Sequence, residues 1–388
     1  MTVLRNAVRR SRRTLTAAVL ALAVVTGTGG WAAGATQRAV TGPAPGAAAW
    51  RADRTLGVRL PDPAHASPAE VARLFAGLTD AQRQALAARH PLTVGNLDGA
   101  PLALRYAANS RALRAERHRE LARAADPAGT PQDHQQARKA AARYATLLAP
   151  GRRILAFDPR GRGQVAEVHG DLATAQRTAV IVPGSDIDLT TFDRTANPYG
   201  TPTGMATSLR RQMAAEAPGV RTAVIAWAGY TTPVGLGPDA ATGRLAEAGA
   251  PRLTRFLAGL AAIGAPAPAV LCHSYGSVVC GLAVPHTGRG DLSDLVVFGS
   301  PGMRRDDVAE LRTTARVWAA RDASDWIGDV PNVEVLGLGH GIDPTDPAFG
   351  ARRVPARQAE GHTGYLAPGT DSLRNFAAIA LGRYADVR

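Results

Sequence analysis

The chain has 388 residues, a formal net charge of +13 and only two cysteines. With 45% hydrophobic and 20% charged residues it has a globular composition, which excludes disordered, collagenous and disulfide-scaffold classes. The length suits one large domain or two of moderate size, and either can bury a sizeable core. Cys272 and Cys280 lie in one apolar segment, where a strand-to-helix turn would aim their side chains apart. We therefore expect two buried thiols.

Residues 1–35 have the pattern of an export signal. Five arginines and no acidic residue occupy residues 1–13, and an apolar run follows from Leu15 to Val25. Residues 11–15 resemble the twin-arginine export motif, and the small residues at 33–35 predict cleavage before Thr36. The alternative is an uncleaved membrane anchor, but the apolar core is shorter than the roughly 20 residues that span a bilayer. We expect a secreted or cell-envelope protein whose signal segment contacts the membrane only transiently.

A helical region is expected between residues 67 and 150. Residues 36–66, rich in Ala, Gly and Pro, have no periodic apolar face and predict a flexible linker. Ser67 and Thr79 are each followed three residues later by Glu or Gln, a spacing that predicts the starts of two helices. Two longer helices are expected at about 102–125 and 132–148. We interpret this region as a helical extension that supports the rest of the chain.

After residue 150 the pattern changes to short apolar runs separated by helical segments. This alternation predicts a mostly parallel sheet covered by helices on both faces. The first two runs are joined by a short turn at 158–163, with no room for a crossover helix, and should pair antiparallel. The expected strands are residues 153–157, 164–168, 179–182, 223–227, 269–272, 295–298, 316–319 and 333–336. Residues 151–388 are therefore expected to form one α/β domain.

The run from Val270 to Val279 carries the strongest chemical signal. A strand leads into a sharp turn at Ser274 and then into a helix, the pattern of a nucleophile elbow. The usual spacing is G-x-S-x-G, and here Cys272 stands in place of the first glycine while Gly276 supplies the second. The alternative is a buried serine that caps the helix.

A serine nucleophile needs an acid and a base, which on such a fold follow it in the order Ser, Asp or Glu, His. His362 lies in a polar, glycine-rich loop before the last helix and is the expected base, with His340 in reserve. The acid should follow the strand at 316–319. Asp325, followed by an apolar pair, is preferred there to Asp322.

An oxyanion hole is expected from two backbone amides. The strand at 179–182 leads into Pro183-Gly184-Ser185-Asp186, a turn that can present N–H groups. The amide of Ser185 and the amide of Tyr275, directly after the nucleophile, are the expected pair.

With these elements in place the sequence resembles the α/β-hydrolase superfamily, and more closely a family of uncharacterised exported bacterial α/β-hydrolases. The stretches that carry the resemblance are residues 78–80 and 95–99, the elbow at 273–276, and residues 299–302, 343–351 and 362–365. The resemblance implies an eight-stranded α/β-hydrolase sheet with an N-terminal helical extension. It also implies a serine hydrolase, esterase-like in class, and reveals no substrate.

Two other readings stay open. His340, Asp343 and Asp346 cluster in one loop and suggest a metal hydrolase, although the prolines after both aspartates favour a rigid turn. The second is a catalytically silent binding or cell-envelope protein that keeps the hydrolase fold.

The expected partner is a small-molecule or lipid-like acyl substrate, and no cofactor or metal is expected. Nucleic acid is not expected as a partner, because the basic charge is almost all arginine and the two longer helices at 102–125 and 132–148 carry only Tyr106 and Tyr144 as aromatics.

Overall fold

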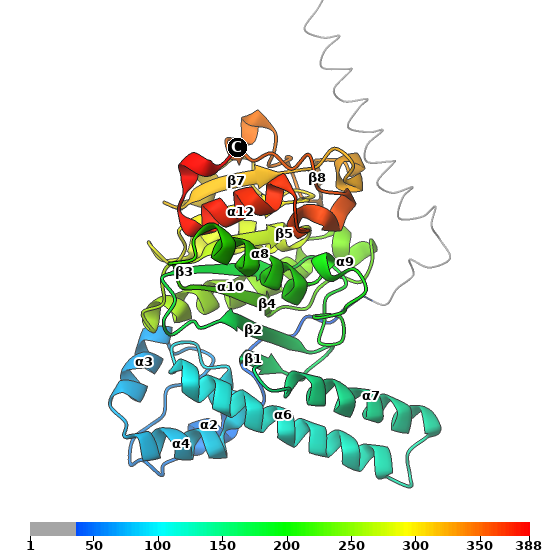
Figure 1. Ribbon diagram of the computed structural model, residues 1–388. Coiled ribbons are helices and arrows are strands. Elements are labelled where there is room, and N and C mark those ends of the chain that lie inside the picture. The colour runs from blue at the N-terminus through cyan, green and yellow to red at the C-terminus, as the bar shows by residue number, and fades with distance from the viewer. Residues whose placement is uncertain (1–35) are drawn as a thin grey trace, which may run out of the picture.

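The computed structural model describes residues 36–388, so the predicted export signal lies outside the described residues. An eight-stranded sheet runs through the molecule with the strand order β1-β2-β4-β3-β5-β6-β7-β10 (Figure 1). Its strands are β1 (Ile154–Asp158), β2 (Gln164–Gly170), β3 (Arg177–Val182), β4 (Thr222–Ala228), β5 (Ala269–His273), β6 (Asp294–Phe298), β7 (Arg316–Ala320) and β10 (Arg352–Arg353).

Strand β2 is antiparallel to both of its neighbours, and every other pair in this sheet is parallel. The predicted antiparallel start is thus confirmed. One predicted strand was misplaced: residues 333–336 contribute β8 (Glu334–Val335), which pairs only with β9 (Leu338–Gly339) in a separate hairpin. The eighth strand of the main sheet is β10, whose two arginines give no apolar signal.

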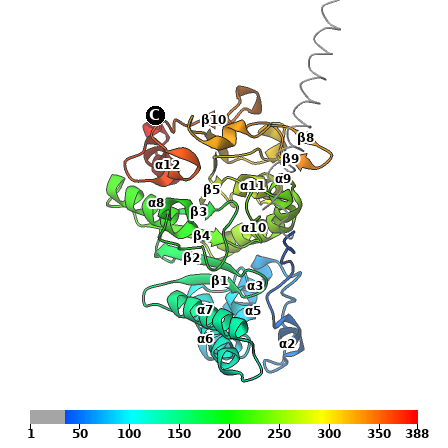
Figure 2. The same ribbon diagram turned by 90° about the vertical axis from the view of Figure 1, so that its right-hand side faces the viewer.

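Helices cover both faces of the sheet. In Figure 2, α8 (Pro202–Glu216) and α12 (Asp371–Leu381) lie on one face, and α10 (Arg244–Ala262) and α11 (Gly276–Ala283) lie on the other. Along β3, Ala179 and Ile181 join one core while Val180 and Val182 join the second, the alternation expected of a strand buried on both sides. None of the helices within residues 36–388 is both long and apolar enough to cross a membrane.

The helical extension lies beyond β1, at one edge of the sheet (Figure 1). Its helices are α3 (Pro68–Ala76), α4 (Asp80–Arg89), α5 (Pro91–Gly95), α6 (Leu102–Ala125) and α7 (Pro131–Leu147). Ser67 and Thr79 both form the predicted capping boxes.

Two asparagines of the extension bind the backbone of the edge strand β1. Asn96 donates to the carbonyl of Phe157 at 2.7 Å and accepts from the amide of the same residue at 3.1 Å. Asn109 donates to the carbonyl of Ile154 at 3.1 Å. Side-chain amides therefore replace part of the hydrogen bonding that a further strand would supply.

Residues 36–66 are not the flexible linker that their composition predicted. They contain a short helix, α2 (Ala47–Ala52), and Trp50 is fully buried in the core of the extension. The indole donates to the carbonyl of Pro61 at 2.7 Å, and its ring meets His90 edge-on at 5.6 Å. Trp50 and Leu60, which no periodic pattern announces, provide most of the apolar burial that orders this segment.

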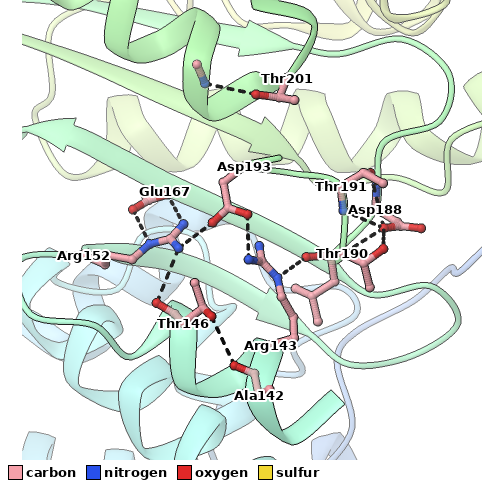
Figure 3. Close-up of polar contacts among 12 residues, drawn as sticks. Ala142, Arg143, Thr146, Arg152, Glu167, Asp188, Thr190, Thr191, Asp193 and Thr201 are labelled. Atoms are coloured by element: carbon pink, nitrogen blue, oxygen red, sulfur yellow. Dashed lines mark hydrogen bonds and ion pairs between the residues drawn. The ribbon is translucent and has the colours of Figure 1, made fainter. Parts of the chain in front are cut away.

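A cluster of ion pairs joins the extension to the sheet (Figure 3). Arg152 forms a bidentate pair with Glu167 on β2 and also contacts Asp193 at 2.6 Å. The other Asp193 oxygen pairs with Arg143 of α7 at 2.6 Å. Arg143 also donates to the carbonyl of Leu189. The loop 188–193, which follows the turn at 183–186, is thereby held on two sides.

Candidate active site

Ser274 occupies the sharp turn between β5 and α11. Its φ of 53° lies in the left-handed region, which a residue other than glycine adopts only at a cost of the order of 1–3 kcal/mol when its surroundings enforce it. The amide of Ser274 donates to the carbonyl of Phe298 on β6 at 3.1 Å. A Cβ atom at Gly276 would lie 2.5 Å from the carbonyl oxygen of Val182, so the helix can approach β3 only with glycine at this position.

The two cysteines form a disulfide, and the prediction of two buried thiols was wrong. The turn at Ser274 folds α11 back along β5, which brings the Cα atoms of Cys272 and Cys280 to 6.6 Å from each other. This separation lies within the range that a disulfide can bridge. The bond links the strand before the nucleophile to the helix after it.

Ser274, His362 and Asp325 form one chain of hydrogen bonds. The hydroxyl of Ser274 lies 2.8 Å from Nε2 of His362. Nδ1 of the same ring lies 2.8 Å from Oδ1 of Asp325. With the proton on Nδ1, His362 donates to the carboxylate and accepts from the serine. The three residues preferred from the sequence are therefore brought together, from the turn after β5, the loop after β7 and the 3₁₀ segment Gly361–Leu366.

Asp325 is buried and ionised in this arrangement. Burial by itself would raise the pKa of its carboxyl, but hydrogen bonds from His362, Tyr365 and the Ile327 amide outweigh it and lower the pKa. Asp322 has a different role. Its Oδ1 accepts from the amide and hydroxyl of Ser324, so this carboxylate closes a local turn. The carboxylate that binds His362 is that of Asp325.

Four residues that were not predicted as site residues support the base. Tyr365 donates to Asp325 at 2.6 Å. His273 places Nε2 2.7 Å from the backbone carbonyl of His362, and burial lowers its pKa to about 3, so it is a neutral donor. Trp326 covers the His362 ring at 4.6 Å between centroids. At Gly299 a Cβ would lie 3.0 Å from Asp325. His273, Gly299 and Tyr365 lie in stretches that carry the family resemblance, whereas Trp326 does not.

The turn expected to form the oxyanion hole lies against the nucleophile. A Cβ at Gly184 would lie only 2.6 Å from the Cβ of Ser274. Within residues 36–388, the backbone amides of Ser185 and Tyr275 have no hydrogen-bond acceptor. Both amides expected to form the hole are therefore free of a competing acceptor, and the turn that carries Ser185 packs against Ser274.

His340, the reserve base, lies away from this chain of contacts. Its Nε2 is 2.7 Å from the carbonyl of Ala240, its ring meets Tyr275 edge-on at 5.4 Å, and burial lowers its pKa to about 4. The other residues of the metal reading also have partners. Asp343 pairs with Arg321 and accepts from Thr345, and Asp346 caps the turn at 347–349. Across residues 36–388 no three His, Cys, Asp or Glu side chains gather as metal ligands.

Comparison with known proteins gives three kinds of match. Residues 158–335 match a family model described as "Alpha/beta hydrolase". Two curated proteins of Mycobacterium tuberculosis, "Uncharacterized protein MT2140" from strain CDC 1551 / Oshkosh and "Uncharacterized protein Rv2079" from strain ATCC 25618 / H37Rv, are each 29% identical over 384 residues. The alignment covers 84% of this chain and 57% of either relative, so the chain spans little more than half of their length.

Solved structures give the third kind of match. A predicted CIB-like hydrolase from Thermoplasma acidophilum has a TM-score of 0.36 at 10% identity, covering 61% of this chain and 97% of that one. A serine hydrolase without a lid from Xanthomonas campestris, XC6422, also has a TM-score of 0.36, at 14% identity, with 61% and 96% covered. The 2,6-dihydroxy-pseudo-oxynicotine hydrolase has a TM-score of 0.35 at 12% identity, with 89% and 93% covered.

The family match begins at the last residue of β1, includes β2 to β7 of the main sheet and the turn at Ser274, and ends in the β8–β9 hairpin, before β10 and His362. It agrees with a mostly parallel sheet whose second strand is antiparallel, and it supports a hydrolase function. The chain therefore has the α/β-hydrolase fold, and residues 158–335 are similar to the hydrolase family that this model describes.

Proposed function

We propose that the protein is a serine hydrolase that cleaves a carboxylic ester or a related acyl substrate. The observation that carries this proposal is the unbroken hydrogen-bond chain from the Ser274 hydroxyl through His362 to Asp325. It begins on a serine held in the left-handed conformation. A serine that merely capped a helix would need neither a histidine at its hydroxyl nor a carboxylate behind that histidine.

The chemistry follows from this arrangement. Nε2 of His362 takes the proton of Ser274 as Oγ attacks the substrate carbonyl, and the amides of Ser185 and Tyr275 donate to the resulting oxyanion. The histidine then gives the proton to the leaving alkoxide, and the C–O bond breaks to leave an acyl-serine. Water, deprotonated by the same nitrogen, attacks the acyl-serine, and the acid departs as Oγ regains its proton.

A fluorophosphonate probe tests the nucleophile. The folded protein should be labelled, and Ser274→Ala and His362→Ala should each abolish labelling and lower ester hydrolysis by several orders of magnitude. Ser293→Ala is the matched control, because Ser293 lies just before β6, at the amino-terminal end of the parallel strands, whereas Ser274 follows the carboxyl end of β5. Folded protein that resists the probe would instead support the catalytically silent reading.

We also propose that the protein acts outside the cytoplasm. Its basic and apolar N-terminal sequence supports this proposal. So does the Cys272–Cys280 disulfide, because such bonds persist mainly in oxidising compartments. Expression of the full chain in an exporting bacterial host tests it: a mature N-terminus at Thr36 in the extracytoplasmic fraction is expected. An uncleaved chain in the membrane would support the anchor alternative, and a chain that stays in the cytoplasmic fraction would contradict the proposal.

A further inference from the structure

Exposed apolar side chains are concentrated near the carboxyl ends of the parallel strands. Eight large apolar side chains are exposed within residues 36–388, and two of them, Val58 and Leu121, belong to the N-terminal segment and the helical extension. The other six lie on three segments at the carboxyl edge of the parallel strands, where Ser274 lies. We call these six the apolar rim: Val234, Leu236, Trp326, Val335, Leu336 and Leu338.

Contacts tie the first two segments of the apolar rim to the site. Val234 stands between Pro233, whose carbonyl accepts from the amide of Asp186 at 2.8 Å, and Gly235, whose amide donates to the side chain of Asp186 at 2.8 Å. Asp186 directly follows the proposed oxyanion residue Ser185. Trp326 lies over the ring of His362. Trp326 therefore contacts the proposed base itself, and Val234 lies between two residues that bind the neighbour of Ser185.

The third segment is the β8–β9 hairpin. Leu338 pairs with Thr242, directly after α9 (Pro238–Ala241), and Figure 2 shows β8, β9 and α9 side by side. The carbonyl of Thr242 accepts from the hydroxyl of Tyr275 at 2.7 Å. The hairpin is thus linked through one residue to the amino acid that follows the nucleophile.

Leu336 at the hairpin tip is the most exposed member. It is 99% exposed and adopts a φ of 52°, in the left-handed region that favours Gly or Asn. In the isolated protein, both the exposure of the leucine side chain to water and its left-handed backbone conformation cost free energy. Contact with an apolar surface would recover part of it.

We propose that the apolar rim seats the protein on aggregated esters with apolar acyl chains, such as a micelle or a lipid surface. This inference rests on the proposed serine hydrolase function, because it names the physical form of that site's substrate. The position of the rim decides between occupants. A second protein or a second copy seated here would cover Ser274, which is only 8% exposed, whereas a surface made of substrate delivers acyl chains to it.

The test compares one ester in dispersed form with one in solution. The full chain is assayed with p-nitrophenyl palmitate in detergent micelles and with p-nitrophenyl butyrate below its solubility limit. Leu336→Asn removes the apolar tip and suits the left-handed turn, so the fold is retained. Leu121→Gln removes an equally apolar, 42% exposed side chain from α6 and serves as the matched control. The N-terminal apolar segment is the same in all three proteins.

We expect Leu336→Asn to lower kcat/KM on the micellar ester about tenfold, because the variant loses the burial of one leucine side chain in the apolar surface. Its kcat/KM on the soluble ester should stay unchanged. Leu121→Gln should change neither. Equal losses on both esters, no loss on the micellar ester, or a similar loss in Leu121→Gln would overturn the inference. Fluorophosphonate labelling separates the two proposals: a labelled enzyme that fails this comparison refutes only the rim, whereas an unlabelled folded protein refutes the hydrolase function on which the rim depends.

Discussion

The hydroxyl of Tyr365 donates a 2.6 Å hydrogen bond to Oδ2 of Asp325, the carboxylate oxygen that His362 does not contact. The same hydroxyl accepts from the amide of Asp322 at 3.0 Å. Burial raises the pKa of Tyr365, so the phenol keeps its proton and its direction of donation is settled. The tyrosine therefore fixes the plane of the carboxylate and holds the loop that carries it.

Replacing Tyr365 should weaken catalysis without affecting substrate binding. In Tyr365→Phe we expect kcat to fall about tenfold to a hundredfold, because a hydrogen bond to a charged group contributes about 1.5–3 kcal/mol. KM should stay unchanged. Loss of this donor should also raise the pKa of Asp325 and shift the acidic limb of the pH–kcat profile upward. Tyr384→Phe removes a comparable bond to Asp294 outside the site and should leave the profile as it is; a shift in both variants would contradict the assignment.

The two aspartates of the 321–327 loop should differ in their effect on rate. Asp325→Asn removes the carboxylate that orients His362, and we expect kcat to fall by about 10³–10⁴. Asp322→Asn keeps an acceptor for Ser324 and should lower kcat less than tenfold. Steady-state kinetics on a soluble ester, with folding checked by circular dichroism, measures both. The reverse order of effects would make Asp322 the acid.

The disulfide should contribute measurably to stability. The cross-link closes a short loop, with a sequence separation of 8, for which chain entropy predicts about 2–3 kcal/mol. We expect Cys272→Ala/Cys280→Ala to lower the free energy of unfolding by this amount in urea titrations. A reducing agent should destabilise the wild type and leave the double variant unaffected. Equal responses of the two proteins to reductant would show that the bond is absent in solution.

Acid should destabilise the fold through two buried histidines. His273 and His340 are 5% and 3% exposed, and burial lowers their pKa values from 6.5 to about 3 and about 4. Below pH 6.5 the unfolded chain binds protons that the folded protein does not, so stability rises with pH from about 4 to 6.5 and is lost on acidification. Each histidine should cost about 2–3 kcal/mol at pH 4.5 relative to pH 7.

Urea unfolding at these two pH values measures that loss. In His340→Gln the difference between pH 7 and pH 4.5 should shrink by one histidine's share. The exposed His286 provides the control, since His286→Gln should leave the difference as in the wild type. An undiminished difference in His340→Gln would contradict the prediction.

The sequence was informative where one local pattern carries the signal. Alternating apolar runs located seven strands of the main sheet, and the order Ser, Asp, His selected three residues that the structure brings within hydrogen-bond reach. It failed where three-dimensional proximity decides. The strand Arg352–Arg353 pairs with β7 through its backbone alone, and Trp50 orders its segment through distant contacts. The disulfide depends on how sharply α11 turns back on β5.

The asparagines that bind β1 give the helical extension a purpose beyond support. An edge strand presents unpaired backbone groups on which a strand of another molecule can add. Asn96 and Asn109 occupy three of those groups on β1, and α6 lies alongside the strand, so an incoming chain finds this edge covered. The extension is thereby a shield against edge-to-edge aggregation: it keeps one molecule's sheet from becoming the template for the next.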